Sequence, residues 1–176
     1  MTARLFIVGD IHACPHELET LLSALSVQPA DRLVFLGDYI DRGSGAREVI
    51  ELLLGLQADE SCQVTFLKGN HDDMFLDFMG YGGLHGDSFL LNGGEQTLLS
   101  YGCDPVLEGI QLAERIPETH RQFFRNLDLS FSAGEVLCMH AGVDPGRPLA
   151  EQDPEDLLWI RTDFIDNPHP LPYTIV

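Results

Sequence analysis

Four mostly apolar stretches of the chain end in polar residues that could bind a metal. The stretches read IVGDIH, FLGDYID, FLKGNHD and CMHAG. Their candidate ligands are Asp10, His12, Asp38, Asn70 and His140. The set mixes oxygen and nitrogen donors without a thiolate, which suits Mn, Fe or Zn better than Ca²⁺, because calcium prefers shells made only of oxygen. The sequence therefore predicts a site for one or more transition-metal ions.

The spacing of these residues is compatible with two neighbouring ions. A carboxylate can bridge two cations, and hydrolytic two-metal sites hold the ions roughly 3.5–4 Å apart. Gly9, Gly37 and Gly69 precede the polar residues of three stretches, and we interpret them as room for the backbone to pass close to the metals. His12 follows Asp10 by two residues, which in an extended loop places both side chains on the same side.

A simpler explanation exists for each stretch taken alone. A single Gly-Asp pair after a strand is more often a solvated turn than a metal site, and a lone histidine there is more often an ordinary hydrogen-bonded residue. Four such stretches, each at the end of a predicted strand, are difficult to explain as independent turns. We therefore favour the metal site.

The elements that must position these residues alternate between strands and helices. Short apolar runs predict strands over 5–8, 33–36 and 64–67. Leucines at helical spacing predict a helix that begins near Pro15, and a second helix follows Ser44, which we interpret as its N-cap. Polar residues after successive strands would converge, because ligands of open α/β sheets bind beyond the carboxyl ends of the strands.

The rest of the chain continues this α/β pattern. Helical patterns lie near 96–101, 117–127 and 153–159, a hairpin is expected from 129–132 and 136–140, and a last strand covers 173–176. The glycine-rich segment 80–94 predicts a long surface loop. We predict a single α/β domain over 1–176.

The composition limits the partners of the protein. A net charge of −18 over 176 residues repels nucleic-acid backbones and acidic membrane faces, so we expect neither as a partner. No run approaches the roughly 18 apolar residues of a membrane helix, and the first apolar stretch is too short for a signal peptide. The four cysteines form no CxxC pair, which favours reduced thiols and a cytoplasmic location.

Several blocks of the sequence together resemble a known family. GDIHA (9–13), GDYIDRG (37–43), GNHD (69–72) and HAG (140–142) are similar in order and spacing to the signature blocks of the phosphoprotein phosphatase class of calcineurin-like metallophosphoesterases. LWIR (158–161) resembles a further block of the small bacterial and phage serine/threonine protein phosphatases. The resemblance implies a β-sandwich core flanked by helices.

The resemblance also implies a role for each candidate ligand. Asp10 and His12 would bind the first divalent ion, Asp38 would bridge both ions, and Asn70 and His140 would bind the second. Mn²⁺ is the expected metal, with Fe or Zn as alternatives. A hydroxide between the ions would attack phosphorus in line, because metal binding lowers the pKa of water from 15.7 to about 7.

The family blocks imply roles for five further residues. By the resemblance, His71 is the acid that protonates the leaving group, and Asp41 orients it. Arg42 and Arg161 would bind the phosphate, since a guanidinium can hold two phosphate oxygens at once. Asp72, where the family often has glutamate, is expected to anchor its loop rather than take part in the chemistry.

The sequence departs from the family pattern in two places. Ala13 stands where the family usually has glycine, and strain is expected if that position needs a positive φ. Family members continue past a strand like YTIV (173–176) into a Gly-His-Thr block, whose histidine completes the second metal shell. The chain lacks that block, so we expect a weakened second metal site and missing C-terminal strands. We expect His169 to be a solvated loop residue.

The predicted function is therefore metal-dependent hydrolysis of phosphomonoesters, with serine/threonine protein phosphatase activity as the leading hypothesis. The substrate would be a phosphorylated protein or a small phosphoester. A hydrolase of dinucleoside polyphosphates such as diadenosine tetraphosphate shares the same blocks and is the alternative enzyme. A module that binds phosphorylated partners without hydrolysing them is the alternative of another class, because of the missing histidine.

Overall fold

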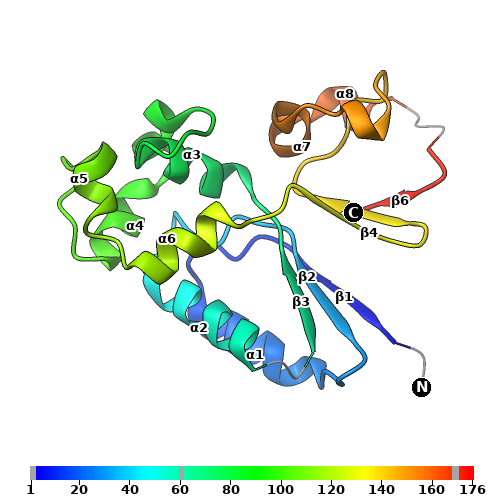
Figure 1. The fold of residues 1–176 in the computed structure, drawn as a ribbon, viewed down its shortest axis with the longest axis horizontal. Coiled ribbons are helices and arrows are strands. Elements are labelled where there is room, and N and C mark those ends of the chain that lie inside the picture. Colours follow the sequence, from blue (N-terminus) through cyan, green and yellow to red (C-terminus); the bar gives the residue numbers. More distant parts are fainter. Residues whose placement is uncertain (1–2, 60–61, 168–170) are drawn as a thin grey trace.

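Two small β-sheets pack face to face in the computed structural model, which describes residues 3–59, 62–167 and 171–176 (Figure 1). The first sheet is parallel and has the strand order β1 (Leu5–Val8), β2 (Arg32–Phe35) and β3 (Gln63–Phe66). The second sheet has the order β4 (Ser130–Ala133), β5 (Val136–Met139) and β6 (Thr174–Ile175). Within it, β4 is antiparallel to β5, and β6 is parallel to β5.

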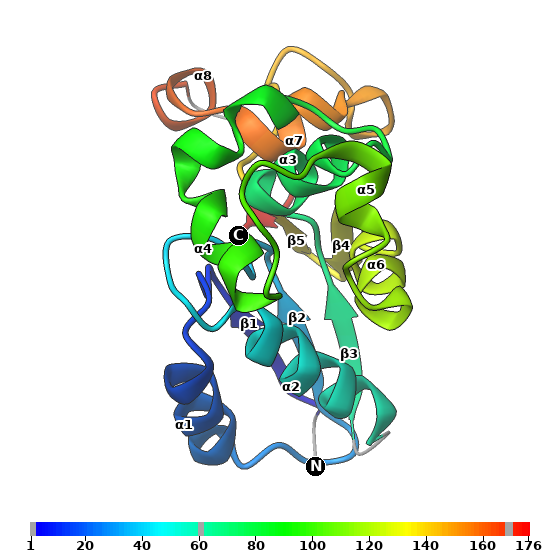
Figure 2. The ribbon, with the colours of Figure 1, turned by 90° about the vertical axis from the view of Figure 1, so that its left-hand side faces the viewer.

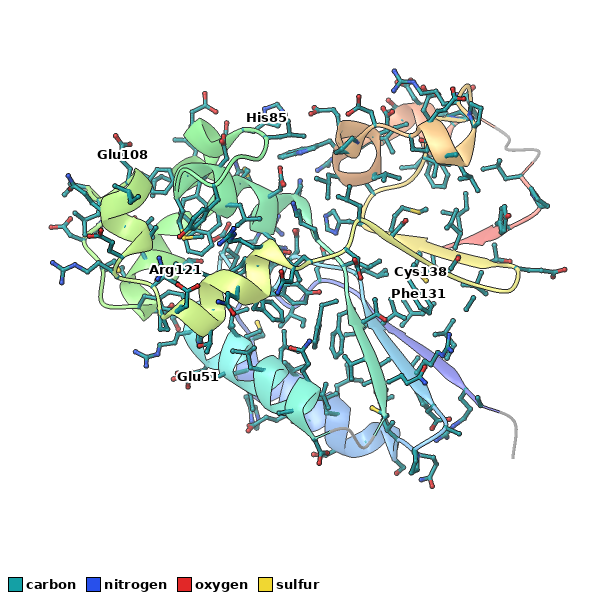
Figure 3. The ribbon with its side chains drawn as sticks, viewed as in Figure 1. Glu51, His85, Glu108, Arg121, Phe131 and Cys138 are labelled. Carbon is teal, nitrogen blue, oxygen red and sulfur yellow. The ribbon has the colours of Figure 1, made fainter. Side chains whose placement is uncertain are left out.

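Successive side chains of β2 point to opposite faces of the first sheet, and both faces are buried. Leu33 and Phe35 belong to the larger core beneath the helices, while Val34 belongs to the small core between the two sheets. This is the two-residue period of a strand that is buried on both faces. Cys138 and Phe131 enter the core between the sheets from β5 and β4 (Figure 3). The predicted β-sandwich core is thus confirmed.

Helices cover the outer face of each sheet (Figure 1). Those on the first sheet are α1 (Pro15–Leu25), α2 (Ala46–Ala58) and α6 (Glu118–Arg125). Those beside the second sheet are α7 (Pro154–Trp159) and α8 (Thr162–Ile165), with the short 3₁₀ helix η3 (Leu149–Glu151) before them. No helix within the described ranges is long and apolar enough to cross a membrane.

The start of α2 differs from the prediction. The helix begins at Ala46 with Gly45 as its N-cap and has no side-chain cap, so Ser44 is not the cap that we expected. Gly45 lies against α1, and a Cβ there would come within 2.5 Å of Pro15 Cδ. The close contact between the two helix starts decides where α2 begins. Pro15 does open α1, as predicted.

The segment 80–94 lies largely at the surface, as its glycines predicted, but it is not a loop throughout. It forms two short 3₁₀ helices, η1 (Gly86–Ser88) and η2 (Leu90–Asn92), and leads into α4 (Gly94–Ser100). Phe89 is fully buried, with its ring 5.2 Å from that of Phe75 and 4.9 Å from that of Phe78. The aromatic contacts order this segment in spite of its glycines.

The sequence also gave no expectation for two other helices in this part of the chain. These are α3 (Asn70–Phe78), which begins at the third polar stretch, and α5 (Gly109–Ala113). Figure 2 shows α3, α4 and α5 gathered beyond the end of the first sheet to which the arrow of β3 points. The parallel register aligns Val8 with Phe35 and Phe35 with Phe66, so the residues that follow the three strands meet at this end.

Candidate metal and phosphate site

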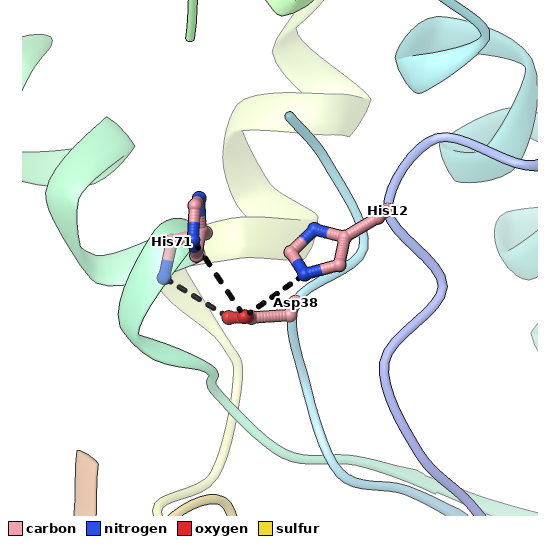
Figure 4. A group of neighbouring side chains, drawn as sticks. All are labelled: His12, Asp38 and His71. Atoms are coloured by element: carbon pink, nitrogen blue, oxygen red, sulfur yellow. Dashed lines mark hydrogen bonds and ion pairs between the residues drawn. The ribbon is translucent and has the colours of Figure 1, made fainter. Parts of the chain in front are cut away.

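The carboxylate of Asp38 lies at the centre of a group of three histidines. His12 Nε2 and His71 Nε2 lie 3.5 and 4.0 Å from Asp38 Oδ2, and His140 Nε2 lies 3.5 Å from Asp38 Oδ1. Figure 4 shows His12 and His71 directed at Asp38 from two sides. The side chain of Asp38 is only 3% exposed. The site therefore brings together groups from four separate parts of the chain.

The orientation of two histidine rings leaves a lone pair directed at this centre. His12 Nδ1 lies 2.9 Å from the carbonyl oxygen of Ile40, and His140 Nδ1 lies 3.0 Å from that of Leu36. A carbonyl only accepts, so both Nδ1 atoms carry the proton and both Nε2 atoms are unprotonated in the neutral ring. Histidine ligands of metals are typically oriented in this way.

Two further observations fit a cation among these residues. His12 Nε2 is buried and has no hydrogen-bond partner within the described chain, which is uncommon for a buried polar atom. His140 Nε2 lies 3.3 Å from Asn70 Oδ1, so two acceptor atoms face each other. A positive ion between them would satisfy both. The donor set and its geometry therefore fit a bound metal.

The structure brings the predicted ligands together. Asp10 is more exposed than the others, and its Oδ2 lies 3.8 Å from His12 Nε2. Ligand atoms of Asp10, Asp38 and His140 all lie within 4.8 Å of one another, as do those of His12, Asp38 and His71. Asp38 is common to both groups, as a bridging ligand would be.

The loop after β1 is a tight turn and not the extended segment that we expected. His12 and Ala13 have φ values of 44° and 57°, and Asp38 has a φ of 54° in the facing loop. The positive φ that Ala13 was suspected to need is thus present, without a glycine to relieve it. Residues other than glycine that have a positive φ are held in it by the surrounding structure, and they cluster at functional sites.

Two glycines of the polar stretches, Gly37 and Gly69, allow the loops that carry them to touch. A Cβ on Gly37 would lie 2.1 Å from the backbone nitrogen of Gly69. A Cβ on Gly69 would lie 2.1 Å from Asp38 Oδ1, whereas a Cβ on Gly9 would meet nothing within 4 Å. For Gly9, the interpretation therefore stays a prediction. At the other two positions, glycine allows two loops to touch and so places the Asp38 carboxylate.

His71 is held by a carboxylate instead of a carbonyl. Its Nδ1 lies 2.7 Å from Asp41 Oδ2, and its Nε2 lies 3.1 Å from Arg42 Nη2. Burial raises the pKa of Asp41, and hydrogen bonds from His71 and Thr97 act against that shift. The backbone N–H of His71 also donates to Asp38 Oδ1 at 3.0 Å, which ties the histidine to the centre of the site.

Asp72 anchors the two loops, as expected. Its fully buried carboxylate accepts hydrogen bonds from the backbone N–H groups of Asp38, Tyr39 and Gly69, at 2.8, 3.2 and 2.9 Å. Burial, and after it the nearby Asp38 carboxylate, raises the pKa of Asp72 well above its ordinary value. Because all three contacts are to backbone, the residue has a structural part in the site.

A cleft of about 370 Å³ opens over the candidate ligands. Arg42 and Arg161, the predicted phosphate-binding residues, both line it, as does Trp159. Asn92 also lines the cleft, and we did not select it from the sequence, because the glycines around it indicated a loop. His169 lies outside the described residues.

Comparison with known proteins places this geometry in a family. The model of the calcineurin-like phosphoesterase family matches residues 3–176. "Serine/threonine-protein phosphatase SIT4" of Candida albicans is 29% identical over 150 residues, which are 83% of this chain and 41% of that protein. "Serine/threonine-protein phosphatase PP1-1" of Saccharomyces cerevisiae is 29% identical over 147 residues, with the same coverage. The chain thus spans about two fifths of the length of these relatives.

Solved structures agree with this assignment. One described as "Crystal structure of a putative diadenosine tetraphosphatase" is 29% identical, with a TM-score of 0.61 over 87% of this chain and 57% of that one. A protein serine/threonine phosphatase from Saccharomyces cerevisiae shares the fold at 19% identity, with a TM-score of 0.56 over 90% of this chain and 52% of that one. The chain belongs to the calcineurin-like phosphoesterase family, whose members imply divalent metal ions at the site described above.

Proposed function

We propose that this chain hydrolyses phosphate monoesters with the help of divalent metal ions, and that its substrates are proteins phosphorylated on serine or threonine. One observation carries the proposal. Unprotonated ring nitrogens of His12 and His140 converge on Asp38, immediately beside the His71–Asp41 pair. A metal centre and a proton donor would thus face the same cleft.

The residues that would hold the metals are those predicted from the sequence. We propose Asp10, His12 and Asp38 for one ion, and Asp38, Asn70 and His140 for the other, with Mn²⁺ as the expected metal. When bound, such ions would supply Lewis-acid chemistry toward water and phosphoryl oxygens. The two carbonyls behind His12 and His140 keep both rings in the tautomer that ligation requires.

His71 would supply the proton for the leaving group. Its Nδ1–H donates to Asp41, so the reacting proton would be held at Nε2, which faces the cleft. The carboxylate of Asp41 holds the ring by Nδ1 and so fixes the direction of Nε2. General acid catalysis of this kind typically contributes about 10²–10⁴-fold.

Arg42 and Arg161 would bind the phosphate from two sides of the cleft. Each guanidinium can bind two phosphate oxygens, and both lie in a chain whose net charge of −18 otherwise repels anions. Arg42 donates to His71 Nε2, so that nitrogen cannot carry a proton while the contact persists. Arg42 would leave His71 when it binds the phosphate, and substrate binding would thereby allow His71 to become protonated.

Two other functions are compatible with the same centre. The similarity to a structure described as a diadenosine tetraphosphatase favours a dinucleoside polyphosphate as the alternative substrate. A module that binds phosphorylated partners without hydrolysis would need only the two arginines and the cleft. The protein phosphatase relatives, at the same 29% identity, support our first choice. Within that reading we also propose a cytoplasmic location.

One set of assays separates these functions. The purified chain would be freed of metal, reloaded with Mn²⁺, and given p-nitrophenyl phosphate, a phosphoserine peptide and diadenosine tetraphosphate, with the metal-free chain as the control. We expect hydrolysis of the first two only after loading. A preference for the dinucleotide would replace the substrate that we propose. Binding of the phosphopeptide without any hydrolysis would contradict the enzyme.

A further inference from the structure

A residue of α4 holds the carboxylate of Asp41 from the side opposite His71. Thr97 Oγ1 donates a hydrogen bond to Asp41 Oδ1 at 2.6 Å and accepts one from the Asp41 backbone N–H at 2.9 Å. Both residues are fully buried, and they lie 56 positions apart in the sequence. A single hydroxyl group thus fixes both the side chain and the peptide of Asp41.

The backbone around Asp41 needs such support. Asp41 and Arg42 are consecutive non-glycine residues with φ values of 68° and 67°. Residues in this region persist where neighbouring contacts over-determine them. The neighbours here are Thr97 and Gly93, whose carbonyl accepts the Arg42 N–H at 3.4 Å. A Cβ on Gly93 would lie 2.9 Å from that nitrogen, so the start of α4 is shaped to fit this turn.

The two oxygens of Asp41 are divided between two partners. Oδ2 accepts from His71 at 2.7 Å, and Oδ1 accepts from Thr97. Without the Thr97 hydroxyl, a buried carboxylate oxygen and a buried N–H would lose their partners together. The carboxylate would then turn about its Cβ–Cγ bond, and the ring of His71 would lose its fixed direction toward the cleft.

We propose that Thr97 is a positioning residue for the hydrolysis, which acts by aligning Asp41 and, through it, the acid His71. The inference rests on the proposed function, because it concerns the proton given to the leaving group. Removal of the Thr97 hydroxyl should therefore matter in proportion to how much the leaving group needs that proton. A residue that only stabilised the fold would affect all substrates equally.

The test compares two substrates of similar size with different leaving groups. Benzyl phosphate releases an alkoxide, which needs protonation, whereas p-nitrophenyl phosphate releases a stable phenolate. In Thr97→Val we expect kcat for benzyl phosphate to fall about 10- to 100-fold, the range typical of outer-shell partners, and kcat for p-nitrophenyl phosphate to change little. Thr97→Ser retains the hydroxyl and should keep the native ratio of the two kcat values. Thr20→Val, at an exposed threonine of α1, is the control for the same substitution away from the site.

If Thr97→Val keeps the native ratio of kcat for benzyl phosphate to kcat for p-nitrophenyl phosphate, the proposal is overturned, whether kcat falls equally for both substrates or for neither. A Thr97→Ser ratio as low as that of Thr97→Val would also overturn it. If Thr97→Val does not fold, Thr97→Cys takes its place, since its thiol fills the space and donates only weakly. An intermediate ratio then supports the proposal, and a native ratio contradicts it.

A readout without catalysis keeps the proposal separate from the proposed function. In the metal-free chain, the proton between His71 Nδ1 and Asp41 should give a downfield ¹H resonance, which Asp41→Asn identifies by removing it. We expect the resonance to shift or broaden in Thr97→Val and to remain in Thr97→Ser. An unchanged resonance in Thr97→Val would overturn the alignment. An inactive wild-type chain, by contrast, would contradict only the proposed function.

Discussion

The histidines around Asp38 are oriented by two different kinds of acceptor. His12 and His140 donate from Nδ1 to the backbone carbonyls of Ile40 and Leu36, whereas His71 donates to the carboxylate of Asp41. A backbone carbonyl is a neutral acceptor that every residue offers. The carboxylate of Asp41 is a charged acceptor that belongs to one side chain. The acceptor behind each ring therefore separates the candidate ligands from the candidate acid.

The Nε2 atoms of the three rings also have different surroundings. The Nε2 of His12 is buried without a hydrogen-bond donor in the described chain, and that of His140 faces the amide oxygen of Asn70. The Nε2 of His71 is instead within 3.1 Å of Arg42. The first two nitrogens are placed to bind a cation, while the third lies beside the guanidinium of Arg42. Substitutions on the two sides should consequently have different effects.

The largest effect should follow from replacing Asp38, which faces both the candidate ligand histidines and the candidate acid. Asp38→Asn takes away the negative charge that faces all three histidines, so we expect loss of Mn²⁺ binding and a fall in kcat/KM beyond the roughly 10⁴-fold limit of an acid. Isothermal titration with Mn²⁺ measures the first effect, and Asp87→Asn, at an exposed carboxylate, is the control. Native metal affinity in Asp38→Asn would rule out our centre.

His71→Asn sharpens the comparison by removing the acid alone. We expect kcat to fall about 10²–10⁴-fold, because the leaving group is no longer protonated, while bound metal stays at the native level. Metal analysis and steady-state kinetics on the same preparation measure both effects, with the exposed His16→Asn as the control. If metal is lost together with activity, His71 is a ligand and the two kinds of histidine are not distinct.

Arg42→Lys should have a smaller effect, confined to the phosphate. A lysine keeps the charge but cannot bind two oxygens in a fixed plane, so we expect inhibition by inorganic phosphate to weaken about tenfold, near the value of one charged hydrogen bond. The inhibition constant measures this effect, and Arg32→Lys serves as a control on the surface. An unchanged inhibition constant would mean that Arg42 contacts His71 but does not bind the phosphate.

The smallest effect on activity is expected far from the site, at the ion pair of Arg4 with Asp31. Hydrogen bonds from Arg4 Nε at 3.1 and 3.2 Å hold the pKa of Asp31 well below its usual range. The unfolded value is about 3.9, so this contribution to stability is present above that pH and is lost as the pH falls below it.

Asp31→Asn removes the pH-dependent part of that stability. Urea unfolding at pH 7 should show a loss of stability relative to wild type, and the difference should shrink at pH 3. Activity at pH 7 should be native. A difference that stays constant with pH would show that the charge of Asp31 is unimportant.

Much of the site could be predicted because its functional residues lie in short blocks of the sequence that directly follow strands. Asp10, Asp38 and Asn70 follow apolar runs that became β1, β2 and β3, and parallel strands bring their carboxyl ends to one edge. The family resemblance then assigned Arg42 and Arg161, which do line one cleft. Their roles in binding phosphate stay predictions.

Other features could not be predicted, because their cause lies in distant parts of the chain. Glycines suggested a loop over 80–94, but the packing of Phe89 against α3 orders it. Ser44 has the chemistry of an N-cap, yet the contact of Gly45 with Pro15 set the helix start one residue later. In both cases tertiary contacts outweighed a local preference.

The sequence by itself determined which functional groups are present and at which strand ends they lie, because residue type and two-residue periodicity are local properties. Only the tertiary structure decided how those groups are oriented. The acceptors behind His12 and His140 are backbone carbonyls, which every residue has, and the partner of Asp41 is a threonine 56 residues away. Such contacts leave no mark in the sequence, since they depend on how distant segments pack.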